Sequence, residues 1–92
     1  MSSTVRIPTV LRVATGGNAT VQVDGATVGE VLDKLAAEYP GIREQLFSID
    51  GSLHRFLNVY INDDDVRYLG ALDAAVTSSD EITLLPAVAG GS

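Results

Sequence analysis

The strongest constraint on the fold is a single helical segment that lies between a capping signal and a helix-breaking pair. Thr27 followed by Glu30 forms a capping box, which predicts a helix start. The pair Pro40-Gly41 predicts its end. Apolar residues recur at helical spacing and make one stripe: Val28, Val31, Leu32, Leu35, Ala36 and Tyr39. One helix of about three turns covers a single face of a four- or five-stranded sheet, so the other face should meet solvent.

Strand patterns flank this helix on both sides. Residues 5–13 alternate in polarity and predict a strand, with Pro8 at a bulge or an edge. A turn at residues 15–18 and a second alternating run at 19–23 complete a β-hairpin. After the helix we expect a helical turn at 42–47, a strand at 53–62, a short return strand at 66–68, a one-turn helix within 69–76 and a last strand at 81–85. This pattern predicts an α+β fold with a mixed four- to five-stranded sheet, in one domain spanning residues 1–92.

Charge and composition narrow the possible functions. The chain of 92 residues carries a formal net charge of −6, which opposes binding to nucleic acid or to an anionic membrane. It has no cysteine, and we see neither a signal peptide nor an apolar run of membrane-spanning length, so we expect a cytoplasmic location. The lone His54 has no catalytic partner at a recognisable spacing. The acidic run at residues 63–65 fails the EF-hand pattern, because Tyr68 and Ala74 occupy the positions of its glycine and glutamate. We therefore expect no catalytic residue, no metal site and no bound cofactor.

The end of the chain is the feature most suggestive of function. Gly90, Gly91 and Ser92 follow an apolar run at 82–88. Glycine has no Cβ, so such a tail is thin and flexible. We expect a mobile tail over residues 87–92 that threads into a narrow channel of another protein through Gly90 and Gly91 and presents a backbone carboxylate there.

Exposed apolar residues beside such a tail would form a docking surface. By alternation, Phe56, Tyr60 and Leu85 fall on the sheet face that the helix leaves open, with Val88 next to them in the tail. We expect these four residues to contact a partner protein, and acidic residues to steer a basic partner toward them.

The sequence resembles a known family in the segments that carry these features. Residues 58–64, residues 80–86 and the Gly90-Gly91 pair look like the ThiS/MoaD group of ubiquitin-like β-grasp sulfur carriers. The likeness covers nearly the whole chain. Within the group, residues 7–12, 53–56 and 85–91 are most similar to the actinobacterial branch that supplies sulfur for cysteine synthesis.

The resemblance implies a role as a protein cosubstrate, not as an enzyme. In this family an E1-like adenylyltransferase/sulfurtransferase uses ATP to activate the terminal glycine carboxylate, which then becomes a thiocarboxylate. By resemblance that glycine is Gly91, but Ser92 follows it, so either a peptidase removes Ser92 in processing or Ser92 is not part of the natural chain. In the cysteine branch, a PLP-dependent cysteine synthase takes the sulfur, and a JAMM-type zinc metalloprotease releases the cysteine. The carrier is expected to be a monomer when free.

Two other functions rest on the same Gly-Gly tail. The chain could serve as a carrier for molybdopterin or thiamin synthesis, or as a ubiquitin-like modifier joined to protein lysines.

Overall fold

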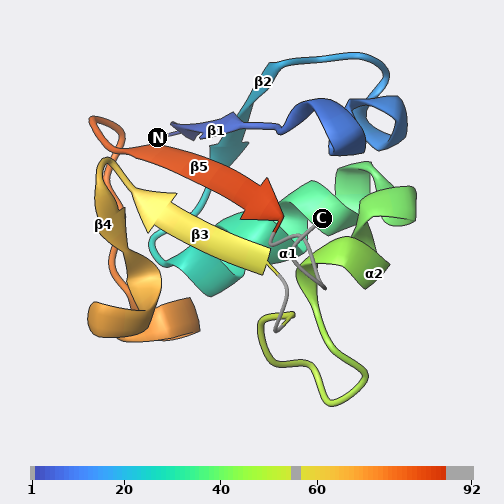
Figure 1. Ribbon diagram of the computed structural model, residues 1–92. Helices are drawn as coiled ribbons and strands as arrows, with labels where there is room; N and C mark the ends of the chain where they lie inside the picture. Colours follow the sequence, from blue (N-terminus) through green and yellow to red (C-terminus); the bar gives the residue numbers. More distant parts are fainter. Residues whose placement is uncertain (1, 55–56, 87–92) are drawn as a thin grey trace.

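A computed structural model describes residues 2–54 and 57–86 of the chain (Figure 1). Its strands are β1 Ser2–Arg6, β2 Thr20–Asp24, β3 Leu57–Ile61, β4 Asp64–Asp65 and β5 Glu81–Pro86. Its α-helices are α1 Val28–Glu38 and α2 Arg43–Leu46. Four short 3₁₀ helices connect them: η1 Thr9–Thr15, η2 Pro40–Ile42, η3 Val66–Tyr68 and η4 Ala71–Asp73.

The strands form one mixed five-stranded sheet in the order β2-β1-β5-β3-β4. The central strand β5 runs parallel to β1 and antiparallel to β3, while the β1–β2 and β3–β4 pairs are antiparallel. The α1 helix crosses one face of this sheet (Figure 1). This is the predicted α+β, ubiquitin-like β-grasp architecture, and the prediction is confirmed.

The predicted cap and apolar stripe hold α1 in place. Thr27 Oγ1 accepts a hydrogen bond from Glu30 N at 3.2 Å, and Glu30 Oε1 accepts from Ala26 N at 3.1 Å, one residue before the expected Thr27 N. All residues of the stripe are buried except Tyr39, which is partly buried against the core. Apolar side chains from one face of the sheet complete the core: Val5, Val23, Leu57, Val59, Ile61, Ile82 and Leu84.

The predicted strand over residues 5–13 is wrong beyond Arg6. Pro8 has no N–H to donate to a neighbouring strand, and its carbonyl oxygen instead accepts from Leu11 N at 2.9 Å, which opens η1. As a result Val13, which a continuous strand would place on the same face as the buried Val5, is 89% exposed. The polarity pattern of residues 5–13 thus extends across the end of β1 and most of η1, which is not a strand.

The predicted return strand at residues 66–68 is also wrong. Asn62 adopts a left-handed backbone with φ 57°. The turn between the two strands therefore contains only two residues, Asn62 and Asp63. The return strand therefore comes earlier, as β4, and Val66–Tyr68 forms η3 after Asp65 Oδ1 accepts a capping hydrogen bond from Arg67 N. Of the strand predicted at 53–62, the described residues show β3 at Leu57–Ile61, while Leu53 forms only an isolated bridge with Phe47.

Candidate functional site

The position of β5 determines where the C-terminal tail leaves the domain. This strand pairs with β1 over residues 81–83 and with β3 over residues 82–86, and its last residue, Pro86, lies opposite Leu57 of β3. The backbone is thus fixed up to the residue that precedes the tail. The predicted tail residues Val88, Gly90, Gly91 and Ser92 lie outside the described residues, as does Phe56.

Tyr60 and Leu85 share the sheet face opposite α1, as alternation predicted. Tyr60 lies opposite Thr83, and Leu85 lies opposite Asn58, so the two side chains are diagonal neighbours across the β3–β5 pair. Such neighbours lie roughly 7–8 Å apart, within contact range of an aromatic ring. Leu85 is 47% exposed and Tyr60 is half-buried. Among the described docking candidates, the structure therefore brings two together next to the start of the tail.

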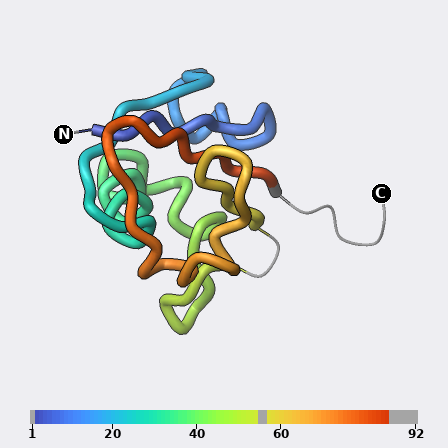
Figure 2. The backbone as a smooth tube through the Cα atoms, turned by 90° about the vertical axis from the view of Figure 1, so that its left-hand side faces the viewer, coloured from blue at the N-terminus to red at the C-terminus, as the bar shows by residue number. Residues whose placement is uncertain are grey.

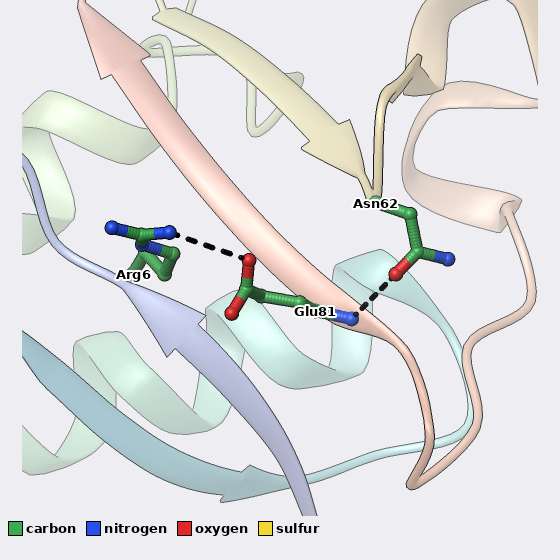
Figure 3. Close-up of polar contacts among 3 residues, drawn as sticks. All are labelled: Arg6, Asn62 and Glu81. Atoms are coloured by element: carbon green, nitrogen blue, oxygen red, sulfur yellow. Dashed lines mark hydrogen bonds and ion pairs between the residues drawn. The ribbon is translucent and has the colours of Figure 1, made fainter.

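Polar side chains surround this apolar pair. Arg6 of β1 forms an ion pair with Glu81 of β5, with Nη1 and Oε1 3.6 Å apart (Figure 3). Arg67 Nη2 donates to Asn58 Oδ1 at 2.5 Å and to the Leu57 carbonyl oxygen at 3.3 Å. The guanidinium group of Arg67 is thus held beside the residue that faces Leu85. An exposed pair such as Arg6–Glu81 adds little stability.

The opposite end of β5 is fixed by a polar turn. Asp80 accepts hydrogen bonds from Thr77 N at 2.9 Å, Asn62 Nδ2 at 3.1 Å and Thr77 Oγ1 at 3.2 Å. The backbone hydrogen bond from Thr77, followed by the side-chain bond from Asn62, holds the pKa of Asp80 below its usual value of 3.8. This turn sets where β5 begins and so fixes its register between β1 and β3.

The part of the chain that the structure describes has no metal-binding cluster, no unpaired buried polar side-chain atom and no membrane-spanning helix. Within residues 2–54 and 57–86, no group of three or more His, Asp or Glu side chains is arranged to hold a metal ion. Over the same ranges every buried polar side-chain atom has a hydrogen-bond partner. None of the helices described there is long and apolar enough to cross a membrane.

Sequence reasoning missed the polar residues of the site. Arg6 and Glu81 are distant in sequence and meet only because β1 and β5 pair in parallel, with Thr4 opposite Glu81. Arg67 was missed because residues 66–68 were predicted as a strand. Alternation along residues 57–61 places Asn58 on the same open face as Tyr60. Because Leu85 also falls on that face, the sequence pattern was sufficient to predict Asn58 as part of the site.

A β-grasp domain whose central strand leads to a Gly-Gly tail is characteristic of a class of small proteins that present their C-terminus to enzymes. The chain belongs to the ThiS family, whose sequence profile matches residues 5–91. The matched region includes Gly90 and Gly91.

Individual relatives resemble the chain over almost its full length. The sulfur carrier protein CysO of Mycobacterium tuberculosis is 52% identical over 93 residues, which cover 99% of this chain and 100% of CysO. The matching chain in a crystal structure of the Amycolatopsis orientalis BexX/CysO complex is 50% identical with a TM-score of 0.89, covering 97% of this chain and 99% of that one. The crystal structure of SAMP1 from Haloferax volcanii is 34% identical with a TM-score of 0.84, covering 99% of this chain and 100% of that one.

Proposed function

We propose that this protein is a sulfur carrier for cysteine biosynthesis that acts as a cosubstrate of partner enzymes. The observation that carries the proposal is the 52% identity to a sulfur carrier protein across the whole of that protein, together with a family match that extends to Gly91. The proposal is supported by the end of β5, where Pro86 pairs with Leu57 of β3 and follows the exposed Leu85.

The proposed chemistry takes place at the Gly91 carboxylate. A carboxylate is a poor electrophile until one of its oxygens becomes a leaving group. An E1-like adenylyltransferase/sulfurtransferase transfers AMP from ATP to a Gly91 oxygen and releases pyrophosphate. A sulfide equivalent then attacks the acyl carbon, AMP leaves with that oxygen, and the thiocarboxylate remains. Since the step consumes ATP, we place it in the cytoplasm.

Ser92 prevents this reaction until it is removed. While Ser92 is present, the Gly91 carbonyl belongs to a peptide bond and has no free carboxylate to adenylate. We therefore propose that a peptidase cleaves after Gly91. The domain 1–86 would remain unchanged by this step, and residues 87–91 would then form the tail, which enters the channel of the enzyme with Gly90 and Gly91 at its end.

Recognition by the activating enzyme is proposed to use the open sheet face. Tyr60 and Leu85 supply apolar contact beside the start of the tail, and Phe56 and Val88 extend it. The net charge of −6 favours a partner with a basic surface. A PLP-dependent cysteine synthase and then a JAMM-type zinc metalloprotease would bind the loaded carrier. The carrier would be a monomer when it binds each of them.

A second candidate function is conjugation to protein lysines. The similarity to SAMP1 and to small archaeal modifier protein 3 of Haloferax volcanii, 40% identical over 68 residues, favours it. Both functions use the same activated glycine and differ only in the nucleophile that follows. Carriers for molybdopterin or thiamin synthesis form a further alternative within the ThiS family.

An affinity-tagged chain recovered from its source cell separates these functions. Intact mass of the free form reports a thiocarboxylate, and peptide mapping of larger species reports isopeptide bonds to lysine. Sulfur transfer predicts a thiocarboxylate fraction and co-purification of a cysteine synthase. Isopeptide adducts without any thiocarboxylate would contradict the proposal and favour the modifier.

A further inference from the structure

A groove of about 1280 Å³ lies outside the sheet, between α1, α2 and the loop at residues 47–54. Its described lining residues all belong to helices and loops, and none to a strand. Tyr60 and Leu85 are therefore not part of it, and a partner in the groove leaves the tail-bearing face of the sheet free.

The walls of the groove are fixed by close contacts. The Arg43 guanidinium carbon lies 5.6 Å from the centre of the Phe47 ring, and Arg43 Nη2 lies 3.1 Å from Asp33 Oδ1. On the other side, Leu72 of η4 approaches Gly29 so closely that a Cβ there would lie 3.1 Å from the Leu72 carbonyl oxygen. The groove thus exists before any partner binds.

A tight loop holds an apolar side chain in solvent at the edge of the groove. Ser48 N donates to the Ser52 carbonyl oxygen at 2.8 Å, and Gly51 N donates to the Ser48 carbonyl oxygen at 2.9 Å. Asp50 Oδ1 accepts from Ser52 Oγ at 2.7 Å and from Ser52 N at 3.0 Å. Ile49 is fully exposed as a result, on a loop that projects from the body of the domain in both views (Figures 1 and 2).

The charge of the groove selects its occupant. Arg43 is its only lysine or arginine among the described lining residues, and it is already paired with Asp33. Four carboxylates line the groove: Glu30, Asp33, Glu44 and Asp50. Nucleic acids and anionic lipids are repelled by this charge, and so is a second copy of a chain with net charge −6. A ligand that carries positive charge next to an apolar side chain therefore complements the groove.

We infer that this groove is a second docking site, which binds a segment of a partner protein carrying lysine or arginine around an apolar residue. The apolar residue packs against Ile49, Phe47 and Leu72. The basic residues meet the carboxylates of Glu44 and Glu30. The site is separate from the tail, so a partner bound here can remain while the tail is engaged elsewhere.

The test uses a short synthetic peptide that alternates lysine and leucine as the probe, with binding followed by amide chemical-shift changes in the full-length protein. The proposal predicts shifts confined to the groove residues. A peptide with glutamate for lysine and one with serine for leucine should both fail to produce them. Ile49→Ser and Glu44→Lys should each weaken binding of the lysine–leucine peptide roughly tenfold or more.

Matched substitutions control for general effects of charge and exposed apolar area. Val13→Ser removes an exposed apolar side chain on η1, and Glu38→Lys reverses an exposed charge at the end of α1. Neither should change the affinity by more than about twofold. The inference is wrong if the shifts spread over the acidic surface, if Val13→Ser weakens binding as much as Ile49→Ser, or if the peptide does not bind. Groove shifts that grow with protein concentration in the absence of peptide would assign the groove to a second copy and also overturn it.

Discussion

Asn62 satisfies both backbone hydrogen-bonding groups of Glu81. Asn62 N donates to the Glu81 carbonyl oxygen at 2.7 Å, and Glu81 N donates to Asn62 Oδ1 at 3.1 Å. The second bond is drawn in Figure 3 beside the Arg6–Glu81 ion pair. The end of β3 is thereby joined to the start of β5. Since β5 leads to the tail, this contact helps fix the position from which the tail begins.

Replacing Asn62 with alanine should destabilise the domain by about 1–3 kcal/mol, because it removes the hydrogen bond to Glu81 N and because alanine lacks the polar side chain that lets asparagine tolerate a left-handed backbone. Asn62→Gly loses the same bond without the steric cost at φ 57°, so it should be less destabilised by about 1 kcal/mol. Urea unfolding of the three proteins measures both differences. Equal midpoints for all three would contradict the role given to Asn62.

Asp80 should make stability depend on pH in the acid range. Its hydrogen bonds from Thr77 and Asn62 lower its folded pKa, so the stability that it contributes is present above its unfolded value, near 3.8. That contribution is lost as the pH falls through the lowered pKa of the folded state. The difference in unfolding free energy between the wild type and Asp80→Asn should therefore be largest near neutral pH and shrink below 3.8. Urea midpoints measured as a pH series check this. The contribution of Asp50, whose pKa is lowered by hydrogen bonds from Ser52, is present in both proteins and cancels. A difference that grows on acidification would contradict the prediction.

The N-terminal cap of α1 should contribute measurably to the free energy of unfolding. Thr27→Ala removes the oxygen that accepts from Glu30 N and should cost about 1 kcal/mol. Thr27→Ser keeps that oxygen, so it should retain most of the stability that Thr27→Ala loses. The shift in urea midpoint measures both changes. If the serine variant were as unstable as the alanine variant, the loss would come from the threonine methyl group and not from the cap.

Leu85→Asp should weaken binding to the activating enzyme roughly tenfold or more, since a charge replaces a half-exposed apolar contact beside the tail. The domain should remain folded, because Leu85 lies on the open face of the sheet. Calorimetric titration with the E1-like partner measures the affinity, and Val13→Asp on η1 is the matched control. Unchanged affinity for the Leu85 variant would remove this residue from the interface.

Local rules predicted the parts of the fold that depend on local contacts. The cap at Thr27 and the stripe from Val28 to Tyr39 identified α1, and alternation placed Tyr60 and Leu85 on the open face. Alternation failed after Arg6, because Pro8 precedes a 3₁₀ helix, in which side chains do not alternate between two faces. It failed again after Asn62, because a left-handed residue changes the length of the turn.

The remainder of the candidate site depends on contacts between distant residues. The Arg6–Glu81 pair requires the parallel register of β1 and β5, which no local pattern specifies. The acidic groove requires residues from α1, α2, the following loop and η4 to come together. Its exposed Ile49 cannot be identified from the sequence, because sequence alone does not show whether other residues cover a lone apolar side chain.

The measurement that tests the central claim most directly is the intact mass of the protein after incubation with an E1-like partner, ATP and a sulfur source. The form that ends at Gly91 should gain the mass difference between sulfur and oxygen, while the form that retains Ser92 should stay unmodified. Gly91→Ala in the trimmed form should slow the reaction, because a Cβ must enter a channel that fits none. His54→Ala should react at nearly the wild-type rate, since the carrier supplies no side-chain nucleophile. Modification of the Ser92 form without cleavage, at the rate of the trimmed form, would contradict the assignment of Gly91 as the reactive terminus.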